Sequence, residues 1–201
     1  MIHIKRHEEP QFWSEYKQKH PSEDYNDLQN TEEGRIVRNK LREYNIDQQH
    51  GLCAYCCKGI ELDNSLNEHI MPRGIGEYSV LSMEYSNIIV SCNVEGKDAT
   101  CSAAKKNIYS SMFVSPLEED CEDHFEFNTS GEIVSDSDRG KYTIDVLNLN
   151  SYRLCNARKA QLRVCDSYND PDMVKKIFLE YDDDNRLQPY ADIIKYFYGD
   201  I

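Results

Sequence analysis

The chain has 201 residues, enough to bury one hydrophobic core without a disulfide staple. Its 23 Lys and Arg residues are outnumbered by 36 Asp and Glu residues, and the net charge of −13 has the wrong sign for a protein that binds nucleic acid by itself. The sequence has no apolar run of membrane-spanning length and its charged start, MIHIKRHEEPQFW, lacks a signal-peptide pattern, so we expect a cytoplasmic protein with no membrane segment.

The positive charges are unevenly placed, and ten of the 23 Lys and Arg residues lie in three short segments. These segments contain Arg35, Arg38, Lys40 and Arg42, then Lys105 and Lys106, then Arg153, Arg158, Lys159 and Arg163. Acidic residues gather elsewhere, at 118–123 and 182–184. A role on nucleic acid therefore requires a local basic surface or a partner that holds the substrate.

The N-terminal part of the chain predicts helices. Residues 11–30 are polar with scattered aromatic side chains, a pattern compatible with helix. Thr31, followed by two glutamates, is typical of a helix start. An apolar stripe then recurs at i, i+4 and i+7, through Val37, Leu41 and Tyr44. We expect this second helix to end before residue 51.

The rest of the chain predicts a mixed structure. Residues 53–114 are rich in cysteine and turn residues, with a short helical segment after Cys101, whereas residues 124–134 alternate around a turn and predict a hairpin. Further helices are expected from Asn150 to about Cys165, from Pro171 onward and after Pro189. The last is amphipathic, with an apolar stripe of Tyr190, Ile193, Ile194 and Phe197.

These elements predict an α+β fold. We expect a helical N-terminal flank at residues 1–50, a small metal-centred core at residues 51–114, and a hairpin and helical region at residues 115–201, all in one integrated domain.

The cysteines indicate a metal site. Cys53 and Cys56 have the two-residue spacing that lets two thiolates reach one zinc ion, and Cys92 and Cys101 would complete a four-thiolate structural site. The eight-residue gap between the second pair is wider than usual, and Cys57 is a candidate substitute ligand.

Other uses of these thiols remain open from the sequence. Cys92 and Cys101 could be small buried hydrophobes. A redox pair at Cys53 and Cys56 is disfavoured, because such motifs follow a strand in an α/β fold and no βαβ pattern is present.

Between the cysteine pairs lie residues suited to hydrolysis. Glu68 and His69 are adjacent, so the carboxylate can hold a divalent cation while the imidazole takes a proton. An oxygen ligand such as Glu68 suits Mg²⁺ or Mn²⁺. Asp123 and His124 are also adjacent, but they lie in the hairpin region and are not flanked by the cysteine pairs.

The order C-x-x-C, E-H-I-x-P, S-N-I, C and C-x-x-x-K resembles the HNH endonuclease family over residues 51–110. The resemblance implies a ββα-metal core braced by zinc. The segments EYSNIIVSC, TIDVLNLNSYRL and PYADIIKYF, with the N-terminal start, further resemble the PtuB HNH subunits of Septu anti-phage defence systems and HNH proteins encoded beside retrons.

The resemblance implies a role for each matching residue. His69 would be the general base that activates water, Glu68 a ligand of the catalytic Mg²⁺, and Asn87 the residue that orients the histidine. Lys105 would contact a phosphate of the substrate.

One position departs from the family pattern. The family usually has His or Asn after the last cysteine, where this chain has Ser102. Ser102 could bind the ion through water, Asn93 could take its place, or the helix register could differ.

The resemblance also implies partners. We expect a nucleic acid substrate, DNA rather than RNA, and an ABC/SMC-type ATPase subunit like PtuA, docked through the region of Phe12 and Trp13 or the helix around Ile193 to Phe197. The alternative is a non-catalytic zinc-braced module that binds protein, whose activity would survive His69→Ala.

Overall fold

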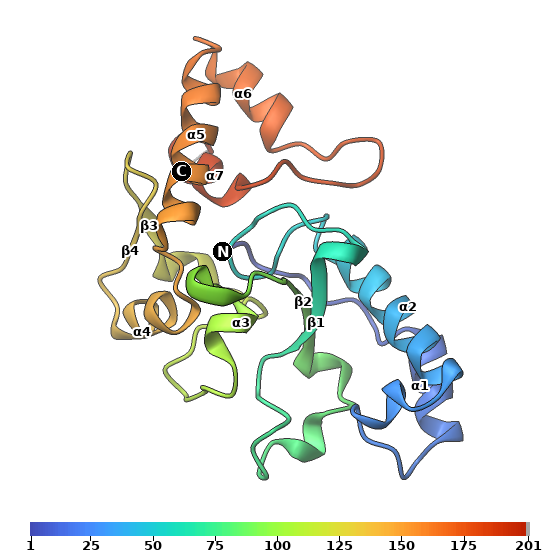
Figure 1. Ribbon diagram of the computed structural model, residues 1–201. Coiled ribbons are helices and arrows are strands. Elements are labelled where there is room, and N and C mark those ends of the chain that lie inside the picture. Colours follow the sequence, from blue (N-terminus) through green and yellow to red (C-terminus); the bar gives the residue numbers. More distant parts are fainter. Residues whose placement is uncertain (200–201) are drawn as a thin grey trace.

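The computed structural model describes residues 1–199, which form helices and two small antiparallel sheets (Figure 1). The strands are β1 (Ser65–His69), β2 (Ile88–Cys92), β3 (Glu126–Phe127) and β4 (Ile133–Val134). The helices are α1 (Gln11–Lys19), α2 (Glu32–Gln48), α3 (Ser102–Lys105), α4 (Asp138–Leu147), α5 (Tyr152–Asp166), α6 (Pro171–Phe178) and α7 (Ala191–Tyr198). The expected α+β class is confirmed.

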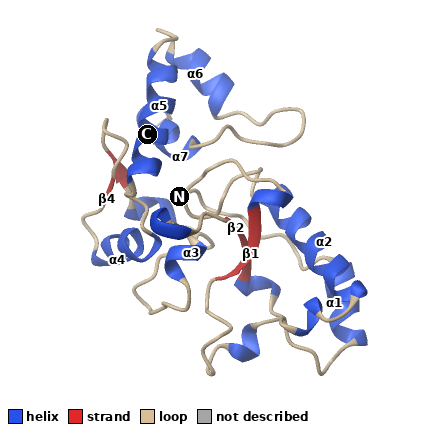
Figure 2. Ribbon diagram, viewed as in Figure 1, coloured by secondary structure: helices blue, strands red, loops and turns tan. Residues whose placement is uncertain are grey.

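The β1–β2 ladder lies between two groups of helices (Figure 2). Helix α2 packs on both strands, and α3 and α4 pack together on the other side of the sheet (Figure 1). In β2, Ile88 joins an aromatic cluster that contains Trp13, whereas the next two residues, Ile89 and Val90, join the main core. Strand β2 therefore contributes to two hydrophobic cores.

Several predicted elements occur where the sequence places them. Helix α2 begins directly after Thr31, whose side chain accepts a hydrogen bond from the Gly34 backbone N–H at 3.0 Å. The C-terminal helices α5, α6 and α7 lie within a few residues of their predicted positions, and β3 and β4 form the expected hairpin.

Other expectations differ from the structure. The N-terminal helix ends at Lys19, and residues 20–30 are mainly turns. The cap of α5 is Ser151 and not Asn150, which instead exchanges two hydrogen bonds with the Ile133 backbone in β4. Helix α4 is not predicted from the sequence.

The expected docking residues are mostly part of the protein's own cores. Trp13, Ile193 and Ile194 are fully buried, so they cannot supply a surface for a partner. Near the C-terminal end of α7, Tyr196 and Phe197 are exposed to solvent.

A buried ion pair joins the start of the described chain to α7. The Met1 ammonium group donates to Asp192 Oδ2 at 2.7 Å, and both groups are buried. Burial by itself lowers the pKa of the amino group, but attraction to Asp192 outweighs it and the pKa rises to about 10. None of the helices within residues 1–199 combines the length and apolar character needed to span a membrane.

Candidate functional site

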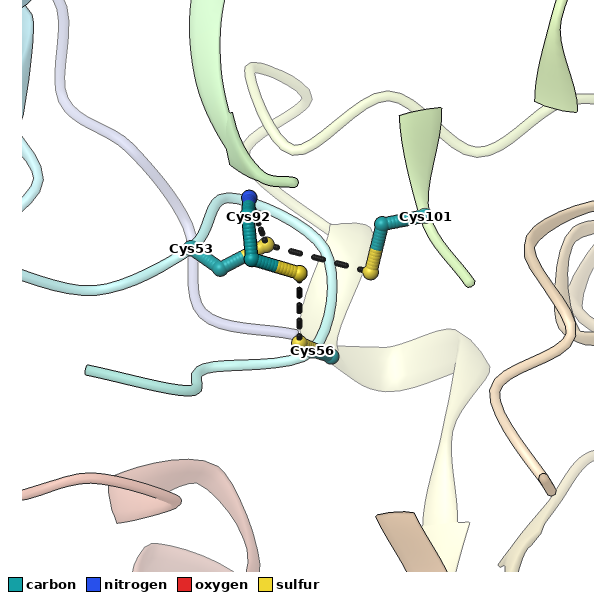
Figure 3. A group of neighbouring side chains, drawn as sticks. All are labelled: Cys53, Cys56, Cys92 and Cys101. Atoms are coloured by element: carbon teal, nitrogen blue, oxygen red, sulfur yellow. Dashed lines mark hydrogen bonds between the residues drawn. The ribbon is translucent and has the colours of Figure 1, made fainter. Parts of the chain in front are cut away.

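Four thiols from three separate segments meet at one point. Cys53 and Cys56 lie in the turn after α2, Cys92 ends β2, and Cys101 precedes α3 (Figure 3). Their sulfur atoms all lie within 4.8 Å of one another, and two pairs, Cys53 with Cys101 and Cys56 with Cys92, are 3.8 Å apart. A zinc ion with sulfur ligands at about 2.3 Å holds them about 3.8 Å apart in a tetrahedron.

The local backbone holds these thiols in place. In the turn, the Cys57 N–H donates to the Cys53 carbonyl at 3.0 Å, and the Cys92 N–H donates to Cys53 Sγ at 3.3 Å. Cys101 has a positive φ of 56°, a conformation that is costly for a residue with a side chain. The Cys101 N–H donates to the Leu147 carbonyl at 2.8 Å, which anchors the fourth ligand to α4.

The environment of the cluster favours a metal. All four thiols are buried, and none forms a disulfide. Burial raises the pKa of Cys53, but hydrogen bonds from Cys101, Cys56 and Cys92 outweigh burial and hold that pKa well below its usual range. Hydrogen bonds within the cluster and burial raise the pKa of Cys101 well above its usual range, and the pKa of Cys56 is also raised although its hydrogen bond with Cys101 acts in the opposite direction. The donor set and its spacing therefore fit one structural zinc ion.

Cys57 is not a substitute ligand. It lies outside the four-thiol group and packs with Leu52 and Ala191. Burial and the nearby carboxylate of Asp192 raise the pKa of its thiol well above the ordinary value, so it is not a reactive thiolate.

Beside the four-cysteine cluster, Glu68 accepts hydrogen bonds on both carboxylate oxygens. Oε1 accepts from Lys105 Nζ at 2.9 Å and from the Tyr55 hydroxyl at 3.2 Å. Oε2 accepts from the Ser102 hydroxyl at 2.5 Å. The first residue of α3 is therefore in contact with the penultimate residue of β1.

His69, at the end of β1, is held by contacts on several sides. Its Nε2 lies 2.9 Å from the Ser82 carbonyl oxygen, which can only accept, so Nε2 carries the proton. The Tyr25 ring packs against the imidazole edge-to-face, with centroids 4.6 Å apart. No hydrogen bond within residues 1–199 reaches Nδ1, so its lone pair is available.

The protonation state of His69 follows from its burial. The side chain is largely desolvated, and the positive charges of Arg73 and Lys105 are close enough to oppose a further one. Burial, followed by these charges, lowers the pKa of His69 to about 4, although the Ser82 carbonyl acts in the opposite direction. The imidazole is neutral at physiological pH.

Asn87 fastens the loop that supplies the Ser82 carbonyl. Its Oδ1 accepts from the Met71 N–H at 2.8 Å, and its Nδ2 donates to the carbonyls of Met71 at 3.0 Å and Leu81 at 3.2 Å. These three bonds hold the two ends of the loop together. Asn87 thus acts on His69 through the loop.

A cleft of about 380 Å³ opens beside these residues. It is lined by Tyr25, Arg38, Arg42, Leu66, Asn67, Glu68, His69, Pro72, Arg73, Ser102, Lys106 and Asn107. Of the residues predicted for catalysis or substrate, Glu68, His69 and Ser102 line the cleft.

Two predicted site residues lie behind the cleft wall. Asn87 is buried in the loop, and the Lys105 side chain is 0% exposed and paired with Glu68. Lys105 also donates to the His69 carbonyl at 2.9 Å. It therefore supports the site from beneath and does not present its ammonium group to a substrate phosphate. Asn93 does not line the cleft either.

Sequence reasoning missed the contribution of the N-terminal segment. Tyr25, Arg38 and Arg42 precede the cysteine motif. The two arginines reach the cleft because α2 packs on β1, and Tyr25, which precedes α2, is held at β1 by a hydrogen bond from Asn67 Nδ2 to its hydroxyl at 2.7 Å. The spacing of Arg38 and Arg42, one helical turn apart, is a signal in the sequence that places these two cations on the same side of α2.

A comparison with curated proteins finds a similar chain, and no family model matches. The "Retron Vc95 putative HNH endonuclease" of Vibrio cholerae serotype O1 biovar El Tor is 35% identical over 140 residues. The alignment covers 64% of this chain and 64% of the relative's length.

Proposed function

We propose that the protein is a metal-dependent HNH endonuclease that hydrolyses phosphodiester bonds of nucleic acid, DNA rather than RNA. The observation that carries the proposal is the setting of His69: its Nε2–H is committed to the Ser82 carbonyl, its Nδ1 makes no hydrogen bond within residues 1–199, and the residue lines the same cleft as Glu68 and Ser102. The similarity to a protein named as an HNH endonuclease supports the same reaction class.

The chemistry needs a base and a centre of positive charge. The neutral Nδ1 of His69 takes a proton from a water molecule as that water attacks phosphorus. The Ser82 carbonyl then stabilises the imidazolium that forms, and Asn87 keeps that carbonyl in place. This part of the reaction uses only groups that the chain provides.

Glu68 is suited to hold the second component. It is the one carboxylate that lines the cleft among the described residues, and its Oε2 is shared with the Ser102 hydroxyl. Mg²⁺ commonly binds through one carboxylate, with water and substrate phosphate as its other ligands, so Glu68 and Ser102 fit such an ion. When bound, the ion would neutralise charge that develops on the phosphate and leaving oxygen.

The zinc in this proposal is structural. Four thiolates complete a tetrahedral shell and leave no position for substrate or water. Its function is to fix β2 and α3, the elements next to β1.

A cleavage assay tests the proposal. Purified protein is incubated with DNA and with RNA, in Mg²⁺ or in its absence, and wild type is compared with His69→Ala. We expect Mg²⁺-dependent cleavage that falls about 100-fold or more in His69→Ala, the usual effect of losing a general base.

The matched control is His124→Ala. His124 also follows an acidic residue, but its Nδ1 lies 2.8 Å from the Ser137 hydroxyl, away from the cleft lining, so cleavage should be unchanged. If His69→Ala cuts as well as wild type, the protein is not an HNH nuclease. The alternative function, a non-catalytic module that binds protein, is then favoured.

We also propose that the protein acts within an anti-phage defence complex with an ABC/SMC-type ATPase of the PtuA kind. The family resemblance, the retron named in the relative and the net charge of −13 support a partner that helps hold nucleic acid. Co-expression with an ATPase subunit of such a system and co-purification tests this, with Tyr196→Ala plus Phe197→Ala as the surface variant. Failure to co-purify with wild type would contradict it.

A further inference from the structure

The cleft beside His69 is lined by four cationic side chains, in a protein whose overall charge is strongly negative. These side chains are Arg38 and Arg42 of α2, Arg73 of the loop after β1, and Lys106 at the end of α3. They come from three elements far apart in the sequence, so the fold brings the charges together.

The two arginines of α2 are placed differently but on one side of the helix. Arg42 is fixed, because its Nη1 donates to the carbonyls of Leu62 at 3.0 Å and Ser65 at 2.9 Å. The Arg38 side chain makes no hydrogen bond within residues 1–199, and its Nε is buried without a partner. One guanidinium group is therefore held in position and the other has unused donors.

The opposite wall of the cleft supplies the other two charges. The Arg73 guanidinium lies 4.9 Å from the centre of the Tyr25 ring, so it is held on the ring that also packs against His69. Lys106 is exposed and has a positive φ of 51°, which turns the chain at the end of α3.

These four charges have no counter-charge in the cleft. The single carboxylate of the lining is Glu68, and Lys105 already pairs with it at 2.9 Å. In the described part of the chain, none of the four cations forms an ion pair with an acidic residue. The cleft therefore presents a net positive charge, and a ligand with several negative charges would satisfy donors that the protein leaves open.

We propose that Arg38, Arg42, Arg73 and Lys106 bind the phosphates that flank the bond to be cut. The choice of nucleic acid as the ligand rests on the function proposed above. Binding by the cleft positions a phosphate next to Nδ1 of His69, and α2, which lies outside the cysteine and histidine motifs, supplies half of the contacts.

Binding measurements test the assignment separately from cleavage. The zinc-loaded protein carries His69→Ala, and a fluorescent 20-base-pair duplex and a 20-nucleotide single strand are titrated by anisotropy at several salt concentrations. The test variant adds Arg38→Ala and Arg73→Ala, because neither side chain donates a hydrogen bond to the described protein. We expect affinity at low salt to fall at least 10-fold, and the slope of log affinity against log salt to shrink by about 1.4 to 1.8 for two lost phosphate contacts.

The control variant makes the same charge change outside the cleft. Arg35→Ala plus Lys40→Ala also removes two cations, and both residues are on α2 but outside the cleft lining. We expect it to change the affinity less than about threefold, the general effect of overall charge. Arg42→Ala is a third variant that should weaken binding, and its folding is checked by thermal denaturation because Arg42 bonds two carbonyls.

The outcomes separate the two proposals. If the cleft variant binds like its parent, if the control variant weakens binding equally, or if neither probe binds at low salt, the assignment is overturned. If the cleft variant alone loses affinity while wild-type protein cuts neither DNA nor RNA, the phosphate-binding cleft stands and the endonuclease proposal fails.

Discussion

Glu68 illustrates how one buried side chain is supported by its neighbours. Glu68 is only 7% exposed, and burying an ionised carboxylate is costly. The cost is offset because Glu68 accepts hydrogen bonds from Lys105, Tyr55 and Ser102. Lys105 is fully buried and forms no other ion pair within residues 1–199, so each charge offsets the cost of burying the other. The pair holds β1 against α3, immediately below the cleft.

Removing one member of this pair should destabilise the protein. Lys105→Met leaves a buried carboxylate without its cation, and we expect the free energy of unfolding to fall by about 3 kcal/mol. The double variant Glu68→Gln plus Lys105→Met should lose less than the sum of the two single changes. Urea denaturation can be followed by the fluorescence of Trp13, the single tryptophan, which is fully buried.

The neighbouring Lys106 provides the control. It is exposed and forms no ion pair in the described structure, so Lys106→Met should change stability by no more than about 0.5 kcal/mol. An unchanged stability for Lys105→Met would show that the buried pair is not needed to hold the site.

At the scale of elements, the four-cysteine cluster compensates for a short helix. Helix α3 has only four residues, too few to be stable by itself, and residues with positive φ precede and follow it. Cys101, which precedes it, belongs to the same four-cysteine cluster as Cys92 of β2, and the Lys105–Glu68 pair at its end attaches it to β1. Without the metal, only the pair and hydrogen bonds would hold it.

Cysteine variants test this dependence. Cys101→Ala removes one of four zinc ligands, so we expect purified protein to carry much less than one equivalent of zinc and to melt at a lower temperature. Cys57→Ala is the matched control, because Cys57 is equally buried but lies outside the cluster. Metal analysis and thermal denaturation measure both effects, and full zinc occupancy in Cys101→Ala would contradict the four-thiolate site.

Elements with strong local signals could be predicted from the sequence, but α4 could not. Thr143 and Ile144 are β-branched and lower the helix propensity, and Gly140 does the same. Gly140 is present for packing, because a Cβ there would clash with Ser135 and the His124 carbonyl. Tertiary contacts, including the buried Thr143 hydroxyl that accepts from the Val114 N–H at 2.8 Å, override the weak propensity.

The candidate site was predictable in part for similar reasons. Short motifs identified the four cysteines, Glu68 and His69, because these residues have characteristic spacing. The support of His69 by Tyr25 and the Ser82 carbonyl depends on contacts between distant segments, which leave no pattern in the sequence. Burial of Lys105 also depends on how α3 packs. The sequence motif therefore identified the residue, but it did not reveal that its ammonium group is buried.

At the scale of the whole molecule, the Met1–Asp192 pair connects distant parts of the chain. The pKa of the amino group is raised from 8.0 to about 10, so the stabilisation is complete below pH 8 and is lost as the pH rises through 10. A shift of two units corresponds to about 3 kcal/mol of stability. This loss should appear between pH 8 and pH 10.

Replacing Asp192 tests this linkage. Asp192→Asn should lower the stability at pH 7 by about 3 kcal/mol and remove most of the decline between pH 8 and pH 10, because the amino group loses its carboxylate partner. Asp183→Asn, at an exposed acidic position, should keep the wild-type stability and pH dependence. Urea denaturation at several pH values measures both, and equal behaviour of the two variants would contradict the role of the pair.

The contribution of β2 to two hydrophobic cores bears on how small a working fragment can be. A piece cut to the motif, residues 51–114, would keep all four zinc ligands together with Glu68 and His69. It would lack the ring that packs on the histidine, two of the four cations of the cleft and the aromatic cluster that covers Ile88. The smallest autonomous unit thus begins upstream of the motif, and domain boundaries drawn from the motif alone would divide the site.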